Sequence, residues 1–141
     1  MIFNFTNNYQ FTTRMNINNV NVEVVNEAKL LGTHITNDLK WDKNTHEMIK
    51  KANARMQLLR KIKSFNAPHK DLKQVYITFI RSLLEQSCTV WNSMLSQENI
   101  QDIERVQKSA CKIILEDNYS EYQNALNQLD IETFAEERFC V

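Results

Sequence analysis

Glycine and proline are nearly absent from this chain, because Gly32 and Pro68 are the single examples among 141 residues. Soluble domains average about 7% glycine and about 5% proline, so few positions here permit a left-handed backbone or force a turn. Phosphate-binding loops of the P-loop and dinucleotide types need several glycines at fixed spacing. The sequence therefore excludes nucleotide binding through a glycine-rich loop.

Long apolar runs are also missing. No uninterrupted run approaches the roughly 18 residues that a membrane-spanning helix requires, and the amino-terminal residues are rich in asparagine where a signal peptide has an apolar core. Hydrophobic residues make up 43% and charged residues 24% of the chain, as in ordinary globular domains. We expect a soluble intracellular protein of one domain's length, without a membrane partner.

Cysteine is sparse, and its pattern predicts no cofactor. Cys88, Cys111 and Cys140 contain no C-x-x-C pair, which argues against a disulfide framework and a zinc knuckle. Cys88 and Cys111 fall on or beside apolar helical positions, where a small buried thiol is the usual outcome. No Asp-Asp pair occurs, and we interpret Glu116-Asp117 as a solvated loop and the three histidines as surface residues. The sequence predicts neither a metal site nor a catalytic group.

The formal net charge is zero, yet the charges separate along the chain. Residues 40–73 contain ten Lys or Arg against three Asp or Glu, whereas residues 96–141 contain four against ten. Two interpretations fit this separation. The basic segment either binds a nucleic acid or forms a solvated helical face that pairs with the acidic half.

The first 36 residues predict β-structure. Apolar residues alternate with polar ones at positions 11–17 and again at 20–24, which is the period of a strand. Asn18 and Asn19 lie between the two runs and tolerate the positive φ of a two-residue turn, so we expect a hairpin over about residues 11–25. A further strand is expected from Leu30 to Ile35, with Gly32 marking a bulge or a close backbone approach. Three such strands would have to complete a sheet supplied by another element.

From residue 44 the apolar period changes to 3.6, which predicts a helical domain over residues 37–141 after a strand domain over residues 1–36. The first helix has an apolar stripe of Met48, Ile49, Ala52, Met56, Leu59 and Ile62. The second opens after Asn66 at Pro68, and its apolar face consists of Leu72, Val75, Tyr76, Phe79, Ile80, Leu83 and Leu84. Ser96 caps a third helix, and shorter helices are expected at about residues 120–128 and from 132 onward. The predicted fold class is α+β: a short antiparallel hairpin plus one strand, followed by a bundle of four to five helices.

Several short motifs follow one another along residues 9–141. They are Lys29-Leu30-Leu31-Gly32, Asp38-Leu39-Lys40-Trp41, Tyr76 on a helix, Val90-Trp91, the E-x-x-Q of Glu104 and Gln107, and the Y-x-x-A-L of residues 122–126. Their order resembles the carboxyl-terminal part of reverse transcriptases from non-LTR retrotransposons of the jockey and CR1 type. The chain departs from that pattern at Glu137-Arg138, where the family has paired arginines.

The resemblance implies a position after the active site of a polymerase. Lys29, Leu30, Leu31 and Gly32 would form a primer-grip-like strand at the end of a palm, and the helices would form a thumb beside the template-primer. The catalytic Asp-Asp hairpin would lie upstream of Met1, in the missing palm and fingers, which leaves a non-catalytic fragment of an RNA-directed DNA polymerase. A shorter stretch, about residues 28–65, is similar to the amino-terminal segment of an AlkB-type alkylation-repair homologue associated with tRNA-modifying methyltransferase or 2-oxoglutarate dioxygenase proteins.

Helical geometry places three lysines in a row opposite the apolar stripe of the first helix, namely Lys43, Lys50 and Lys61, with Arg60 at the margin. A row of cations suits phosphates, which it contacts without reading sequence. Lys40 adds a further cation, and we interpret the adjacent Trp41 as a core anchor in preference to a residue that stacks on a base. We expect at most binding of RNA or an RNA–DNA duplex; the alternative is a helical protein-interaction module that binds no nucleic acid.

The missing carboxylate pair generates a first prediction. Polymerisation needs carboxylates that hold two metal ions about 3.5–4 Å apart. Purified chain supplied with a primed RNA template, deoxynucleotides and Mg²⁺ should therefore extend no primer in a gel-based assay. Extension that survives repurification to constant specific activity would contradict the non-catalytic interpretation.

Overall fold

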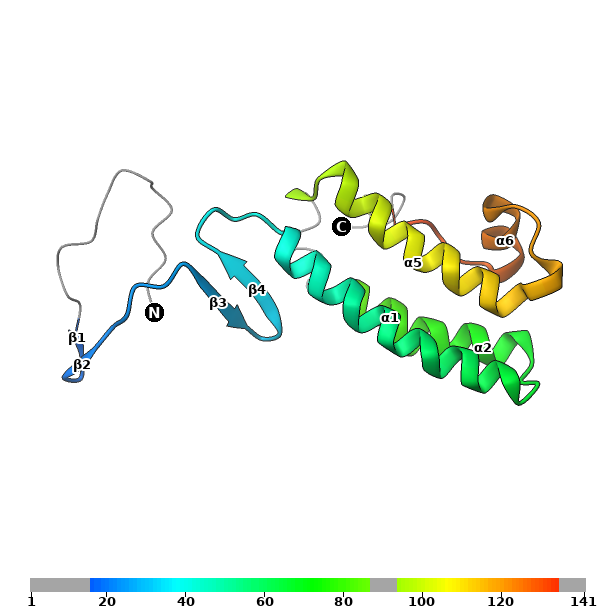
Figure 1. The fold of residues 1–141 in the computed structure, drawn as a ribbon, viewed down its shortest axis with the longest axis horizontal. Helices are drawn as coiled ribbons and strands as arrows, with labels where there is room; N and C mark the ends of the chain where they lie inside the picture. Colours follow the sequence, from blue (N-terminus) through cyan, green and yellow to red (C-terminus); the bar gives the residue numbers. More distant parts are fainter. Residues whose placement is uncertain (1–15, 87–93, 135–141) are drawn as a thin grey trace. The chain divides into compact units, whose positions relative to one another are not determined.

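The computed structural model describes residues 16–86 and 94–134, and these form an α+β protein, as the sequence predicts (Figure 1). The chain divides into two compact units, Met1–Asn44 and Thr45–Val141. All strands of the described residues belong to the first unit. Apart from the first turn of α1, the helices of the described residues belong to the second unit.

The first hairpin confirms the expected asparagine turn. Strand β1 (Asn16–Ile17) pairs antiparallel with β2 (Val20–Asn21). Asn18 and Asn19 adopt φ values of 50° and 63°, the left-handed backbone that this type of turn needs at both central positions. The ladder has only two residues on each side, and residues 11–15 of the expected strand lie outside the described part of the chain.

The single strand expected from Leu30 to Ile35 is wrong, because the chain reverses within it. Strand β3 (Glu27–Leu30) pairs antiparallel with β4 (Thr33–Thr36). Leu31 and Gly32 form the turn between them, with φ values of 49° and 89°. Gly32 therefore permits a two-residue hairpin turn and marks no bulge. The adjacent leucines Leu30 and Leu31 concealed this turn, since leucine is a poor residue for a left-handed position.

Helix α1 (Asp42–Ser64) begins two residues earlier than expected and buries the predicted stripe. Met48, Ala52, Met56 and Leu59 are buried, while Ile49 and Ile62 are half-buried at its margins. An acidic residue in the first turn and two lysines in the last turn suit the helix dipole. Asn66 at φ 57° follows the helix and turns the chain toward the next one.

The second predicted helix contains a π-helical segment. Helix α2 (His69–Val75) continues into η1 (Tyr76–Arg81) and then α3 (Ser82–Leu84). A π turn holds more residues than an α turn, so it shifts the phase of the buried face. Ile80 and Arg81 are consequently both buried, whereas Phe79 is 53% exposed. The prediction that Phe79 belongs to the core is therefore wrong, and the same prediction for Tyr76 is confirmed.

The remaining helices follow the predicted order. Ser96 caps α5 (Gln97–Leu115), and its hydroxyl accepts a hydrogen bond from the Asn99 amide at 3.2 Å. A short 3₁₀ segment, η3 (Glu116–Asn118), leads to α6 (Tyr122–Leu129), which ends at Asp130 with φ 50°. The helix expected from residue 132 is not present at residues 132–134, and its remainder lies outside the described residues.

Helices α1 and α5 run side by side in the same direction (Figure 1). Lys63 near the end of α1 donates to the Ile114 carbonyl at 3.3 Å and pairs with Glu116 at 3.1 Å, both at the end of α5. None of the helices in the described ranges is both long enough and apolar enough to cross a membrane.

The turn at Leu31 generates a second prediction. A leucine at φ 49° is strained, and asparagine accepts this backbone more readily. Leu31→Asn should therefore stabilise the β3–β4 hairpin by about 0.5–1 kcal/mol, seen as slower amide hydrogen exchange in Ala28 and Ile35, which face each other in the ladder as a hydrogen-bonded pair. Leu30→Asn, at the end of the strand, is the control and should give no such slowing. Unchanged exchange in the Leu31 variant would contradict the observed turn.

Candidate nucleic-acid interface and buried polar network

The predicted cations of α1 and of the segment before it divide into two groups according to their partners. Lys50, Arg60 and Lys61 are all exposed; Lys50 and Lys61 lie opposite the buried stripe, and Arg60 lies at the margin of that face. None of the three makes an ion pair within the described residues. Their charges are therefore available to a partner.

Lys40 and Lys43 are engaged by carboxylates of the first unit. Lys43 forms an ion pair and a hydrogen bond with Glu27, and this contact lowers the pKa of that carboxyl. Lys40 lies 3.7 Å from Asp38, whose pKa is lowered first by the Thr36 hydroxyl and then by the Lys40 amide. The predicted row of three lysines is thus reduced to Lys50 and Lys61 as available charges.

The predicted primer-grip-like residues lie at the tip of a hairpin. Lys29 and Leu30 close strand β3, and Leu31 and Gly32 are the turn. Leu31 is 87% exposed. Trp41, in contrast, is only 6% exposed, so the prediction that it is a buried residue is confirmed and stacking on a base is excluded in this conformation.

Basic residues of α5 form a second group that the sequence analysis did not single out. Arg105 lies near the middle of the helix and Lys108 and Lys112 lie in its second half, and no acidic residue occurs between positions 105 and 115. Lys108 and Lys112 lie over the rings of Tyr122 and Tyr119, at 5.9 and 5.5 Å from the ring centres. The net negative charge of residues 96–141 concealed this cluster. Counting the charge of each half of α5 separately would have revealed it.

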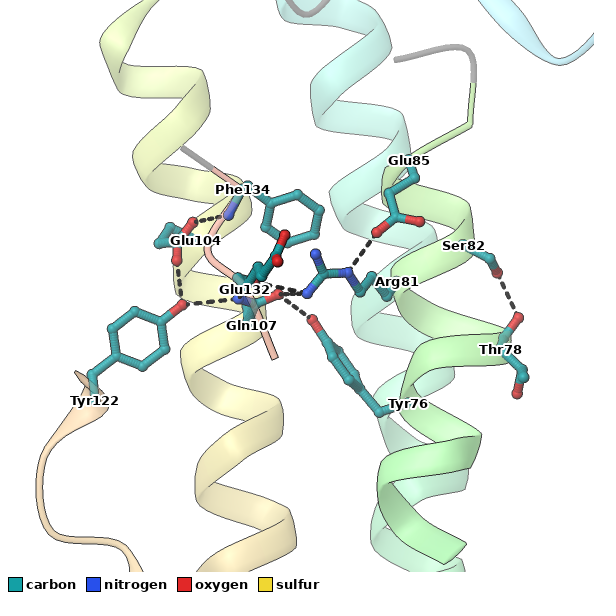
Figure 2. A network of polar contacts seen from close by, with 10 residues as sticks. All are labelled: Tyr76, Thr78, Arg81, Ser82, Glu85, Glu104, Gln107, Tyr122, Glu132 and Phe134. Carbon is teal, nitrogen blue, oxygen red and sulfur yellow. Dashed lines mark hydrogen bonds and ion pairs between the residues drawn. The ribbon is translucent and has the colours of Figure 1, made fainter. Parts of the chain in front are cut away.

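A buried polar network centres on Gln107, whose side chain is fully buried (Figure 2). Its carbonyl oxygen accepts from the Tyr76 hydroxyl at 2.8 Å and from Arg81 Nη1 at 3.2 Å. Its amide nitrogen donates to the Glu132 carbonyl at 2.9 Å and to the Tyr122 hydroxyl at 3.2 Å. The amide thereby uses its full hydrogen-bonding capacity.

Arg81 and Glu104 extend this network to the segment after α6. Arg81 pairs with Glu85 through Nε, donates to the Glu132 carbonyl at 2.9 Å and lies 5.0 Å from the centre of the Phe134 ring. Glu104 accepts from the Tyr122 hydroxyl and, at 3.3 Å, from the Phe134 amide. Side chains of α5 and η1 therefore satisfy the backbone of residues 132–134, which is not helical.

Burial sets the protonation of this region. Desolvation raises the pKa of Tyr76 well above its usual value, and desolvation followed by the Glu104 hydrogen bond raises that of Tyr122. Burial likewise raises the pKa of the Cys111 thiol to about 11. Both hydroxyls are thus neutral donors at physiological pH, and Cys111 is a protonated thiol unsuited to nucleophilic attack.

The motifs that carry the sequence resemblance meet in this network. Tyr76 comes from the tyrosine-bearing helix, Glu104 and Gln107 from the E-x-x-Q segment, and Tyr122 from the Y-x-x-A-L segment. The side-chain hydrogen bonds of these residues each join one element of the second unit to another. Their arrangement is that of structural ties. Arg81 also belongs to this network, although the sequence analysis did not single it out. Its position among the apolar residues of the second predicted helix was the signal that could have identified it.

No metal site is evident in the part of the chain that the structure describes. His69 and Asp71 have the H-x-D spacing of an iron-binding motif, yet no three His, Cys, Asp or Glu side chains of the described residues could hold a metal ion together. Glu116 and Asp117 lie in the exposed segment η3. Val90-Trp91, Cys88, Cys140 and Glu137-Arg138 lie outside the described residues.

Comparisons with protein-family models, with curated proteins and with solved structures find no match for this chain. The resemblances to reverse transcriptases and to the AlkB-type segment therefore rest on the order of motifs in the sequence.

The network generates a third prediction. Gln107→Ala removes the only acceptor that the described residues offer to the buried Tyr76 hydroxyl, and it leaves a cavity. The free energy of unfolding should fall by about 2–3 kcal/mol, measured by urea denaturation. Gln101→Ala, on the exposed side of the same helix, is the matched control and should change it by less than about 0.5 kcal/mol. Equal effects of the two substitutions would contradict a network that organises the unit.

Proposed function

We propose that this chain binds the phosphate backbone of RNA or an RNA–DNA duplex without reading sequence, as a non-catalytic, thumb-like segment of a retrotransposon-derived RNA-directed DNA polymerase. The observation that carries the proposal is the exposed face of α1, where Lys50, Arg60 and Lys61 have no ion-pair partner among the described residues. Point charges of this kind bind phosphates in any sequence.

The spacing of these cations suits a polyanion. Lys50 and Lys61 are eleven positions apart, or about 16 Å along the helix at roughly 1.5 Å per residue. Double-stranded nucleic acid presents one charge per roughly 1.7 Å of its axis, so the pair can contact separate phosphates of one molecule. The two lysines share one side of the helix, since eleven residues complete close to three turns.

Intramolecular pairing uses other cations. Lys63 pairs with Glu116 and Lys73 with Asp130, so these two lysines make the ion pairs between the basic and acidic segments within the described residues. Arg55 donates to the Phe79 carbonyl and so supports the π turn. The interpretation that the basic helix merely neutralises the acidic half accounts for Lys63 and leaves Lys50, Arg60 and Lys61 without a function.

A protein-interaction module is the second candidate. Leu58 on α1 and Phe79 on η1 are exposed apolar side chains, and Arg55, one turn before Leu58, bonds to the Phe79 backbone. Phe65 after α1 is exposed as well.

The AlkB-type alternative would keep RNA as the partner, since the similar segment belongs to proteins that modify tRNA.

The lysine face generates a fourth prediction. Lys50→Glu with Lys61→Glu should weaken binding to an RNA–DNA duplex and lower the slope of log K against log salt by about 1.4–1.8, since each lost phosphate contact contributes roughly 0.7–0.9. Fluorescence anisotropy at several salt concentrations measures this slope. Circular dichroism should remain unchanged, because both side chains are on the exposed face.

Lys70→Glu serves as the matched control for either single substitution. Lys70 is exposed on α2 and has no ion pair within the described residues, so its replacement makes the same change in net charge. Lys61→Glu should reduce the salt slope more than Lys70→Glu does. Equal slopes for wild type and the double variant, with normal circular dichroism, would overturn nucleic-acid binding through α1.

A further inference from the structure

A surface groove of about 340 Å³ lies between α1 and α5, beside the proposed phosphate-binding face. Its lining residues are Ile49, Asn53, Asp102, Arg105, Val106 and Ser109. This volume is at the lower end of the roughly 300–1,000 Å³ of small-ligand sites. The groove is therefore of a size for one unit of a polymer strand and far too small for a duplex.

The groove combines an apolar floor with neutral hydrogen-bonding groups. Ile49 and Val106 are its apolar residues, and the exposed Asn53 and Ser109 are its uncharged polar ones. The Ser109 hydroxyl donates to the Arg105 carbonyl at 2.8 Å, so its lone pairs remain available to accept. Asn53 makes no hydrogen bond through its side chain within the described residues and offers both a donor and an acceptor.

The charges around the groove favour phosphate at its rim and an uncharged group inside it. Lys50 follows Ile49 directly on α1, and Arg60 lies seven residues beyond Asn53, on the same side of the helix. Arg105 pairs with Asp102 on the groove wall. The carboxylate of Asp102 disfavours an anion inside the groove and can accept a hydrogen bond from a hydroxyl. Phosphates are thus favoured at the cationic rim, and a neutral hydroxyl-bearing group is favoured within.

We infer that this groove receives a ribose of an RNA strand and recognises its 2′-hydroxyl through Asn53 and Ser109, while Lys50 contacts an adjacent phosphate and Arg60 contacts a phosphate further along the strand. The inference rests on the proposed function and deepens it, because it assigns the groove to the RNA strand. The 2′-hydroxyl both donates and accepts hydrogen bonds, and it is the group by which a protein distinguishes RNA from DNA. The apolar floor faces the carbon-bound hydrogens of the sugar.

The test compares duplexes of one sequence that differ at the ribose. Wild-type chain is titrated by fluorescence anisotropy with an RNA duplex, with a 2′-fluoro RNA duplex, which keeps the A-form shape without the hydroxyl, and with a DNA duplex. Loss of two hydrogen bonds of about 0.5 kcal/mol or more each corresponds to at least a fivefold change. The wild type should therefore bind RNA about 5- to 10-fold more tightly than 2′-fluoro RNA.

Substitution then assigns the preference to the groove. Asn53→Ala with Ser109→Ala should bring the ratio of RNA to 2′-fluoro affinity to within twofold of one, with affinity for 2′-fluoro RNA unchanged. Gln57→Ala with Gln101→Ala removes two polar side chains of the same helices outside the groove and should preserve the ratio.

Each remaining outcome decides the matter. Equal and salt-dependent binding of all three duplexes by the wild type overturns the ribose site and leaves the proposed function standing. A preference that persists in the groove variant, or disappears in the control variant, also overturns the assignment to this groove. Binding of no nucleic acid at all overturns the proposed function and the ribose site together.

Discussion

The buried amide of Gln107 is the interaction on which the second unit depends. A polar group removed from water is unfavourable unless it is hydrogen-bonded, and Gln107 has four partners, which lie on η1, at the start of α6 and in the segment after it. The amide can form all four hydrogen bonds only when α5 has one particular rotation about its axis and one particular position along it relative to these elements. Apolar contacts supply most of the driving force, and the network selects one arrangement among those that bury similar area.

The π-helical segment η1 is a consequence of the same constraint. It brings Arg81 inward, where its guanidinium reaches Gln107, the Glu132 carbonyl and the Phe134 ring. It also turns Phe79 outward, and Arg55 supports the turn by donating to the Phe79 carbonyl. An uninterrupted α-helix would place a different residue at the position that Arg81 occupies. The backbone of η1 therefore departs from the α-helix in a way that lets the buried Arg81 guanidinium reach its hydrogen-bond partners.

The cations of the chain divide into those that hold elements of the fold together and those that the proposed function assigns to a partner. Lys63, Lys73 and Arg81 are held by contacts that join separate elements, whereas Lys50, Arg60 and Lys61 contribute no such contact among the described residues. The proposed binding face is composed of this second set, and the groove beside it adds the uncharged groups that a sugar requires. Removal of the second set should therefore affect binding without affecting folding.

The sequence by itself determined features that depend on neighbours along the chain: the buried stripe and lysine face of α1, the Ser96 cap, and the left-handed turn at Asn18 and Asn19. These follow from periodicity and from the preferences of single residues. Only the tertiary structure decided the Leu31–Gly32 turn, the π segment, the convergence on Gln107 and the groove at Asn53 and Ser109. Each of these depends on hydrogen bonds or packing between residues distant in sequence, or on strain that such packing tolerates, and a local pattern contains no record of either.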